Sequence, residues 1–259
     1  MIAVDVNADI GHWAFRRLMY NEADELAKLL RSAGIGAAII GPVEGILYRD
    51  PAEAVELLFE RLNDCAESFK LLPAAVINPA FPGWRSLLAK SIDKGIVAVK
   101  MYPNYHDYQA NGEQARELVE AATEAGLPVI CCVRVEDERQ HHWHMLMPPV
   151  PASEVAELAK AVEGARVILA SANQREIEAF LTEAPPERSW AEVSYLKSPI
   201  NSVEYMVQRF GHERLLLGTH APFLTPGVSV AKVKQAAISD EAKQAILLDN
   251  ARRIWPELR

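Results

Sequence analysis

The stretch from Ile96 to Arg134 contains an apolar run, an amphipathic segment and a second apolar run, in that order. The first run reads IVAVKM (Ile96–Met101) and the second reads PVICCVR (Pro128–Arg134). Between them, NGEQARELVEAATEAG (Asn111–Gly126) spaces its apolar residues as on one face of a helix and ends in a glycine. Runs that are apolar throughout predict strands of a parallel sheet that is covered on both faces. The stretch therefore predicts a strand–helix–strand unit.

The same unit recurs along the chain, because helical patterns separate eight apolar runs of strand length. The runs are Ile2–Val6, Gly36–Gly41, Leu72–Asn78, Ile96–Met101, Pro128–Arg134, Ala165–Ser171, Ala191–Leu196 and Arg214–Thr219. Eight strands that alternate with helices predict an α/β fold of the (β/α)8 TIM-barrel type, as one domain over residues 1–259. An open doubly wound sheet is the alternative, but no GxGxxG motif follows the first run.

The composition is that of an ordinary globular protein. Of the 259 residues, 50% are hydrophobic and 24% are charged, and the formal net charge is −8. The acidic balance does not favour nucleic-acid binding, and no apolar run approaches the roughly 20 residues that a membrane span needs. Three cysteines, two of them adjacent, do not make a disulfide framework, and the first residues do not resemble a signal peptide. We therefore expect a cytoplasmic protein that contacts neither nucleic acid nor membrane.

Polar residues follow the apolar runs, at the place where a barrel of this kind carries its active site. The carboxyl ends of all eight strands meet at one mouth, so residues far apart in the sequence converge there. Strand ends also meet water, and a polar residue there is not by itself evidence of function. The residues that we expect to bind substrate are Asn7, His12, Glu44, Asn78, Tyr102, Asn104, Arg134, Glu136, Arg139, His142 and Ser171.

Two further residues stand out. Lys100 lies inside an apolar run, where an unpaired ammonium group is costly to bury. It is either a functional amine or the partner of a buried acid such as Asp5, Asp9 or Glu136. His220 directly follows the last apolar run, and it is a metal ligand, a base or a residue of a turn.

Several segments resemble the amidohydrolase superfamily of metal-dependent barrel hydrolases, in the branch that also contains aromatic-acid decarboxylases and lactonases. The resemblance covers nearly the whole chain, and it implies a TIM barrel with hydrolase or lyase chemistry. The similar segments are IAVDVNADIG (Ile2–Gly11), VAVKMYPNYHDY (Val97–Tyr108), LVEAATEAGLPVICCV (Leu118–Val133), RLLLGTHAPF (Arg214–Phe223) and ISDEAKQAILLDNARRIW (Ile238–Trp255).

The resemblance does not extend to the metal ligands. Family members carry His-x-His on the first strand, a histidine after the fifth and after the sixth strand, and an aspartate after the eighth. The matching positions of this chain carry Asn7, Asp9, Cys132, Ser171 and His220. We therefore expect no obligatory metal of the usual kind and no other cofactor.

Two metal alternatives remain open. A catalytic zinc ion needs three nitrogen, oxygen or sulfur ligands and one open position, and Asp9, Cys132 and His220 would supply three ligands of those types. In the second alternative, the three histidines of the loop His141–His144 would be the ligands of the metal ion.

The remaining polar residues favour an acid–base site for a small anionic molecule. Lys100, Arg134 and Arg139 would place cations at the mouth, and arginine suits carboxylates. The first and last strands are neighbours in a closed barrel, so Asp9 and His220 would form a proton-transfer pair. We take Asp9, His220 and Lys100 as the candidate catalytic residues.

The favoured function is metal-independent cleavage of an ester or lactone, or a related lyase reaction, on a small carboxylated substrate. A non-catalytic or binding relative of the amidohydrolases is the first alternative, because Asp9 and His220 would also suit a structural ion pair. A metal-dependent hydrolase with rearranged ligands is the second. Homo-oligomer formation is a further expectation, with the segment Met145–Pro151 as a lid or contact segment.

Overall fold

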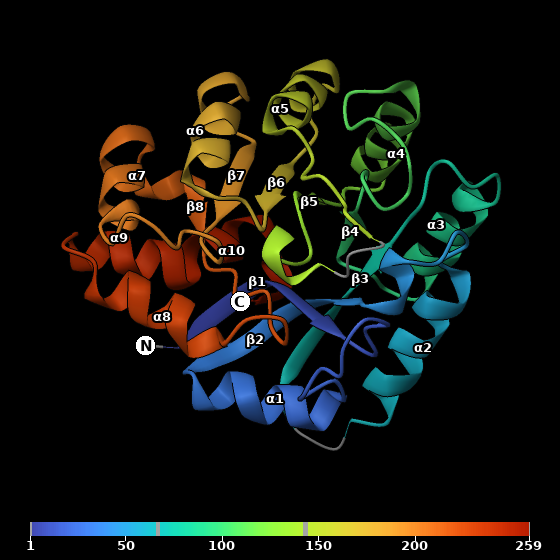
Figure 1. Ribbon diagram of the computed structural model, residues 1–259, viewed down its shortest axis with the longest axis horizontal. Helices are drawn as coiled ribbons and strands as arrows, with labels where there is room; N and C mark the ends of the chain where they lie inside the picture. The colour runs from blue at the N-terminus through green and yellow to red at the C-terminus, as the bar shows by residue number, and fades with distance from the viewer. Residues whose placement is uncertain (1, 66–67, 142–144, 259) are drawn as a thin grey trace.

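The computed structural model describes residues 2–65, 68–141 and 145–258. Eight parallel strands pair in chain order from β1 to β8 (Figure 1). Backbone hydrogen bonds from Val6 N to Leu217 O and from His220 N to Asn7 O join the segment after β8 to β1. The predicted (β/α)8 barrel is therefore confirmed. The strands are β1 Ala3–Ile10, β2 Ile35–Pro42, β3 Lys70–Val76, β4 Ala98–Met101, β5 Val129–Cys132, β6 Val167–Ala170, β7 Ser189–Glu192 and β8 Leu215–Leu216.

Helices follow the strands and surround the barrel (Figure 1). The last helices form one continuous helical stretch from Asp240 to Ile254, with a π-helical turn at Ala245–Asp249. The helices are α1 Ala23–Ser32, α2 Ala52–Asn63, α3 Trp84–Asp93, α4 Glu113–Glu124, α5 Ala152–Ala161, α6 Gln174–Glu183, α7 Ser202–Phe210, α8 Pro226–Gln235, α9 Asp240–Gln244 and α10 Asn250–Ile254.

Two apolar layers account for the runs that are apolar throughout. Side chains such as Val99 pack outward against helix residues such as Leu118. Side chains such as Ile130 and Ile168 fill the barrel interior, because successive residues of a strand point to opposite faces. Trp255 joins the inner layer and its indole donates a hydrogen bond to the Val97 carbonyl just before β4. The amino-terminal end of the barrel is therefore filled, and the polar residues of the interior gather toward the other end.

Strand β1 is longer than the apolar run Ile2–Val6 that predicted it. It continues to Ile10, so Asn7 and Asp9 lie within the strand rather than after it, which corrects the expected placement. Both side chains are fully buried. Polar residues remain in a strand at this position because they form hydrogen bonds with buried partners inside the barrel, as described below.

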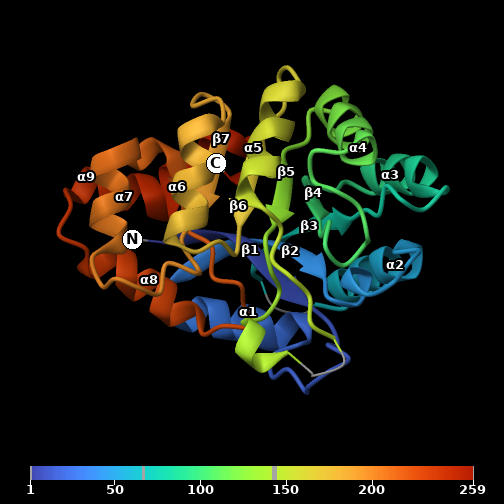
Figure 2. The ribbon, with the colours of Figure 1, turned by 45° about the horizontal axis from the view of Figure 1, so that its top comes forward.

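The loops at the carboxyl ends of the strands meet over the barrel. Figure 2 shows the segment after β5 running across to the loop after β1. Glu136 of the former segment accepts hydrogen bonds from Trp13 Nε1 at 2.8 Å and from Arg16 Nε at 2.6 Å. The two loops are thus tied together at the mouth. Across the described residues, none of the helices combines the length and the apolar character that a membrane crossing requires.

Candidate functional site

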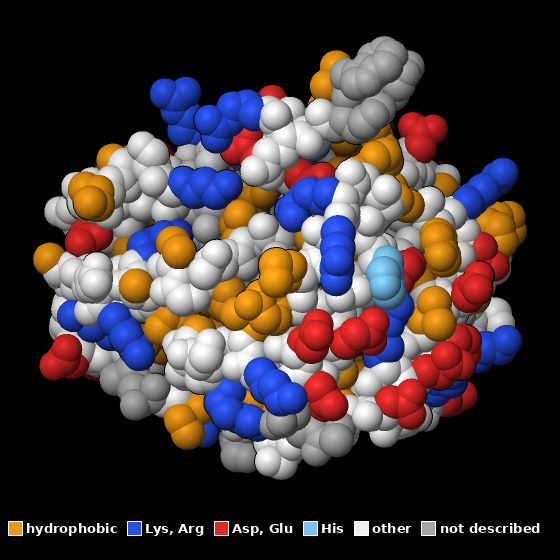
Figure 3. Space-filling model, turned by 60° about the horizontal axis from the view of Figure 1, so that its bottom comes forward, with side chains coloured by type: hydrophobic (Ala, Val, Ile, Leu, Met, Phe, Trp, Pro, Cys, Tyr) orange, Lys and Arg blue, Asp and Glu red, His pale blue; other side chains and the backbone are white. Residues whose placement is uncertain are grey.

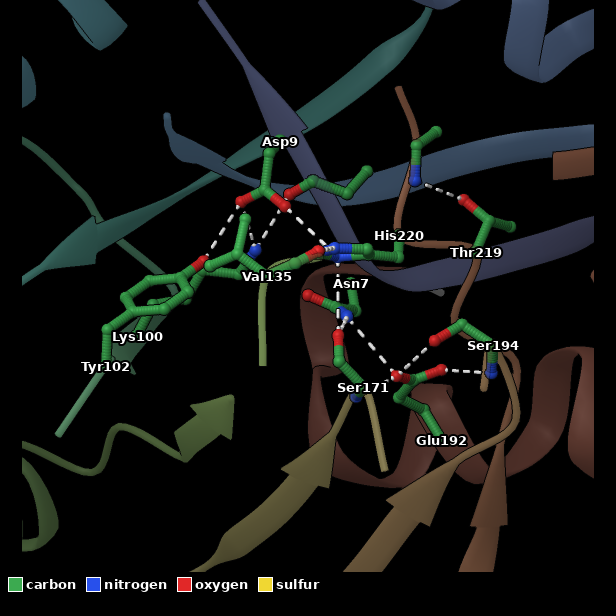
Figure 4. A network of polar contacts seen from close by, with 12 residues as sticks. Asn7, Asp9, Lys100, Tyr102, Val135, Ser171, Glu192, Ser194, Thr219 and His220 are labelled. Carbon is green, nitrogen blue, oxygen red and sulfur yellow. Dashed lines mark hydrogen bonds and ion pairs between the residues drawn. The ribbon is translucent and has the colours of Figure 1, made fainter. Parts of the chain in front are cut away.

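A cluster of fully buried polar side chains lies inside the barrel beneath the mouth (Figure 4). Lys100 of β4 places its Nζ 2.6 Å from Asp9 Oδ1 and 2.9 Å from the Ala8 carbonyl oxygen. The Tyr102 hydroxyl lies 3.3 Å from the same Asp9 oxygen. Lys100 was expected to be open to the mouth, but it is the partner of a buried acid, as its place in an apolar strand also allowed. The positive charge of Lys100 therefore stabilises the Asp9 carboxylate and does not face the mouth.

His220 lies next to Asp9, as their places on neighbouring segments predicted. Its Nε2 is 2.6 Å from the Val135 carbonyl oxygen, which only accepts hydrogen bonds, so Nε2 carries a proton. Its Nδ1 is 3.3 Å from Ser171 Oγ and 3.6 Å from Asp9 Oδ2. Burial lowers the pKa of His220, and the Asp9 carboxylate opposes that shift. A neutral imidazole with its lone pair on Nδ1 is the form that accepts a proton.

The backbone at His220 and at Ser171 is left-handed, with φ of 54° and 56°. Non-glycine residues adopt this region at a cost, and structures keep it where surrounding contacts require it. The required contacts are present, because Asp5 accepts a hydrogen bond at 2.9 Å from the backbone N–H of Thr219, next to His220. The Ser171 N–H donates at 2.5 Å to Glu192. Both turns thus aim their side chains at each other.

Glu192 was not among the predicted site residues, although it holds this part of the barrel together. Its carboxylate accepts hydrogen bonds from the Ser171 N–H, from Asn7 Nδ2 at 3.3 Å, and from Ser194 N at 2.6 Å and Oγ at 2.7 Å. A Cβ at position 218 would lie 2.2 Å from Glu192 Oε2, so a glycine is needed there. A carboxylate inside the apolar run Ala191–Leu196 is the same sequence signal that singled out Lys100.

Aromatic rings cover the cluster from the side of the mouth. The ring of Phe223 stacks on His220 with centroids 4.9 Å apart, and Tyr195 meets His220 edge-on at 5.8 Å. Trp13 packs against Phe223 at 5.5 Å. Asp9 and His220 are both 0% exposed. A substrate therefore reaches Nδ1 of His220 only when this cover moves aside.

A cavity of about 370 Å³ lies beside the cover, at the ends of β5, β6 and β7. Arg139 pairs with Asp137 through two hydrogen bonds of 2.8 Å, and Lys197 Nζ lies 4.0 Å from Asp137 and 4.0 Å above the Tyr195 ring. Lys197 was not among the residues predicted to bind substrate. The cavity is lined by Arg134, Asp137, Glu138, Arg139, Asn173, Tyr195, Lys197 and Ser198.

Arg134 is less available than the sequence suggested. Its guanidinium donates to the Ser171 carbonyl at 2.9 Å and forms a two-point ion pair with Glu176 of α6. Since Glu176 also belongs to the capping box at the start of α6, this arginine fixes the Ser171 turn to that helix. It contributes charge to the cavity wall, while its hydrogen bonds go to the protein.

The other predicted substrate-binding residues mostly hold loops in place. Asn78 donates to the Arg49 carbonyl at 2.9 Å, and Asn104 donates to the Pro148 carbonyl at 2.9 Å. Glu44 forms an ion pair with Arg61 at 2.6 Å, and the exposed His12 side chain lies 3.6 Å from Glu44. His142 lies outside the described residues, together with most of the histidine-rich loop.

The side chains beneath the mouth do not fit a catalytic zinc ion. One oxygen of Asp9 already accepts a hydrogen bond from the Lys100 ammonium, so that this pair would offer a metal only Asp9 Oδ2 and His220 Nδ1. Burial raises the pKa of Cys132 to about 12, which keeps its thiol protonated at neutral pH. Within residues 2–65, 68–141 and 145–258 no group of three or more His, Cys, Asp or Glu side chains is arranged to hold a metal. The set Asp9, Cys132 and His220 therefore does not provide three zinc ligands.

Acidic and basic side chains are mixed on the outer surface shown in Figure 3. The cavity wall contains three basic side chains, Arg134, Arg139 and Lys197, and two acidic ones, Asp137 and Glu138, in a chain of net charge −8. A small anion gains from such a local cluster in a way that a long polyanion does not.

Comparison with known proteins places this barrel among amidohydrolases. A family model described as amidohydrolase matches residues 43–256, whereas no curated protein matches the chain. A 2,6-dihydroxybenzoate decarboxylase from Rhizobium has a TM-score of 0.70 at 17% identity, covering 99% of both chains. A putative amidohydrolase from Staphylococcus aureus has a TM-score of 0.74 at 10% identity, covering 99% of this chain and 100% of the other.

A third solved structure is a probable 2-pyrone-4,6-dicarboxylic acid hydrolase from Acinetobacter baumannii with citric acid bound. Its TM-score is 0.66 at 12% identity, covering 99% of this chain and 100% of the other. At such identities the likeness shows the shared barrel fold.

Proposed function

The chain belongs to the amidohydrolase family, and on that premise we propose that it cleaves the C–O bond of an ester or lactone, or catalyses a related lyase reaction, on a small carboxylated substrate. The proposed reaction does not use the family's usual metal site. The decarboxylase and the pyrone-dicarboxylate hydrolase with similar barrels support a carboxylated substrate. The chemistry itself is argued from the residues of this chain.

The observation that carries the proposal is the contact between a cationic cavity and a buried proton acceptor. Tyr195 lines the cavity on one side and meets the His220 ring at 5.8 Å on the other. A substrate carboxylate bound by Lys197 and by Nη1 of Arg139, the guanidinium nitrogen outside the pair with Asp137, would place the remaining substrate atoms toward Tyr195. Movement of the aromatic cover then brings the reacting bond to His220. Binding and proton transfer are thereby assigned to adjacent parts of one mouth.

In the ester or lactone reaction, a water molecule attacks the acyl carbon and passes a proton to Nδ1 of His220. The C–O bond to the leaving alkoxide breaks, and the alkoxide receives that proton from His220, so that an ester gives an acid and an alcohol and a lactone gives one hydroxy acid. Asp9 Oδ2, 3.6 Å from Nδ1, stabilises the imidazolium that forms in between. Lys100 is a positioning residue in this scheme, because it holds Asp9 in place.

We expect Arg139→Ala and Lys197→Ala each to raise KM for a carboxylated substrate about tenfold, because a hydrogen bond to a charged group contributes about 1.5 kcal/mol or more. The measurement is a turnover screen with carboxylated lactones and esters, each paired with its uncharged analogue. The uncharged analogues should respond less than threefold to either change.

Lys160→Ala is the matched control, because Lys160 lies on α5 and pairs with the exposed Glu183. It should leave KM unchanged. If the cavity variants handle carboxylated and uncharged substrates with the same KM as the wild type, the cavity does not bind the carboxylate. If no compound of the screen is converted, the proposed reaction is wrong.

A further inference from the structure

We propose that the Lys100 ammonium is the resident cation of this barrel and takes the place that a divalent metal ion would have beside Asp9 and His220. This inference goes beyond the reaction proposed above and does not depend on it. It concerns which positive charge the side chains beneath the mouth are built to hold.

The contacts of Lys100 are those of a bound cation. Its Nζ lies 2.6 Å from Asp9 Oδ1 and 2.9 Å from the Ala8 carbonyl oxygen, and both Lys100 and Asp9 are 0% exposed. The Tyr102 hydroxyl, 3.3 Å from Asp9 Oδ1, also faces this oxygen. A carboxylate oxygen with these two donors is already satisfied, so it has little to offer a second cation.

The neighbouring strand leaves space for the lysine stem. Gly41 of β2 pairs in register with Asp9, and a Cβ at position 41 would lie 2.7 Å from Lys100 Cδ and 3.4 Å from Asp9 Oδ1. Any larger residue there would have to displace the buried stem of Lys100 (Figure 4 shows the stem reaching Asp9). Asp9 therefore accepts the hydrogen bond of the ammonium group, and the absence of a side chain at Gly41 leaves room for the aliphatic part of Lys100.

The atoms that remain are a poor ligand set for a divalent ion. His220 Nε2 faces the Val135 carbonyl, which leaves Nδ1 of His220 and Oδ2 of Asp9, 3.6 Å apart, together with Asn7 Oδ1, a neutral amide oxygen without a hydrogen-bond partner among the described residues. A zinc site needs at least three protein ligands. An ion at this position would also lie close to the Lys100 ammonium, which repels it. One nitrogen, one carboxylate oxygen and one neutral amide oxygen beside a fixed positive charge do not favour a divalent cation.

The test is thermal denaturation of the full-length protein with excess chelator, zinc or manganese, combined with elemental analysis. The wild-type Tm should change by less than about 1 °C under all three conditions. In Lys100→Met the buried Asp9 carboxylate loses its partner, and Tm should fall by roughly 10 °C, as expected for breaking a buried ion pair in a chain of this length. Lys160→Met, which removes an exposed ammonium, should lower Tm by less than about 2 °C.

The wild-type arm decides the question even if Lys100→Met does not fold. One equivalent of bound zinc or manganese that raises Tm and is lost in His220→Asn overturns the proposal. Zinc that remains bound in His220→Asn is bound at another site, and the proposal for the Lys100 site then stands. Because the readouts are Tm and metal content, a metal-free protein without activity would support this inference while contradicting the proposed function.

Discussion

Replacing His220 by asparagine is expected to lower kcat/KM by at least about a hundredfold, because a positioned general base contributes about 10² to 10⁴ to a rate. Asparagine retains a polar side chain near the Val135 carbonyl, but its amide group is much less basic than an imidazole and cannot accept the proton. Its effect should fall on kcat, since the carboxylate is bound elsewhere in the mouth. Steady-state kinetics on the best substrate of the screen measure it.

The control for this variant is His212→Asn. His212 lies before β8, at the other end of the barrel, and its Nε2 is 3.4 Å from the exposed Glu213. It should leave kcat/KM within about twofold. A His220→Asn enzyme that retains more than a third of the wild-type kcat/KM would show that the proton goes elsewhere.

The pH profile gives an independent check on His220. Burial lowers the pKa of His220 below 6.5, so the neutral, proton-accepting form predominates above that lowered pKa. Activity should therefore fall on the acid side with a midpoint below pH 6.5. A midpoint above pH 6.5 would assign the rate to another group.

The largest effect on stability is expected from Glu192→Ala, which should lower the free energy of unfolding by about 3–5 kcal/mol. Its carboxylate accepts hydrogen bonds from Ser171, Asn7 and Ser194, and truncation leaves these buried donors without an acceptor. Urea denaturation followed by circular dichroism measures the change.

Glu192→Gln is the matched variant, because its amide oxygen keeps most of these hydrogen bonds while the amide nitrogen faces one N–H group. It should lose less than half as much stability as Glu192→Ala. Glu183→Ala, on the exposed end of α6, should lose less than about 1 kcal/mol. Equal losses in Glu192→Ala and Glu183→Ala would show that the Glu192 network does not stabilise the fold.

The sequence was sufficient to predict the barrel, because an apolar run of strand length followed by a helical pattern repeats eight times along the chain. It also predicted that Asp9 and His220 would meet, since closure of a barrel makes its first and last strands neighbours. The distance of 3.6 Å between their side chains follows from that closure.

The partners of the charged residues could not be predicted in the same way. Glu176, which forms an ion pair with Arg134, lies on a helix. The hydrophobic pattern predicts where that helix lies in the sequence, but not which residues its polar side chains contact. The cavity formed by Arg139 and Lys197 depends on loop conformations, and loops carry little periodic signal. Glu192 was not predicted, although a carboxylate within an apolar run was visible, because site residues were sought after the run Ala191–Leu196 whereas the strand already ends at Glu192.

The most direct test of a metal-independent site beneath this mouth is turnover by chelator-treated wild-type protein. The panel would contain carboxylated lactones, carboxylated esters and aromatic acids, with metal content measured on the same samples. The account predicts product from at least one class, at a rate that the chelator does not lower and added zinc or manganese does not raise. Product that forms only after a metal is restored, or no product from any class, would contradict it.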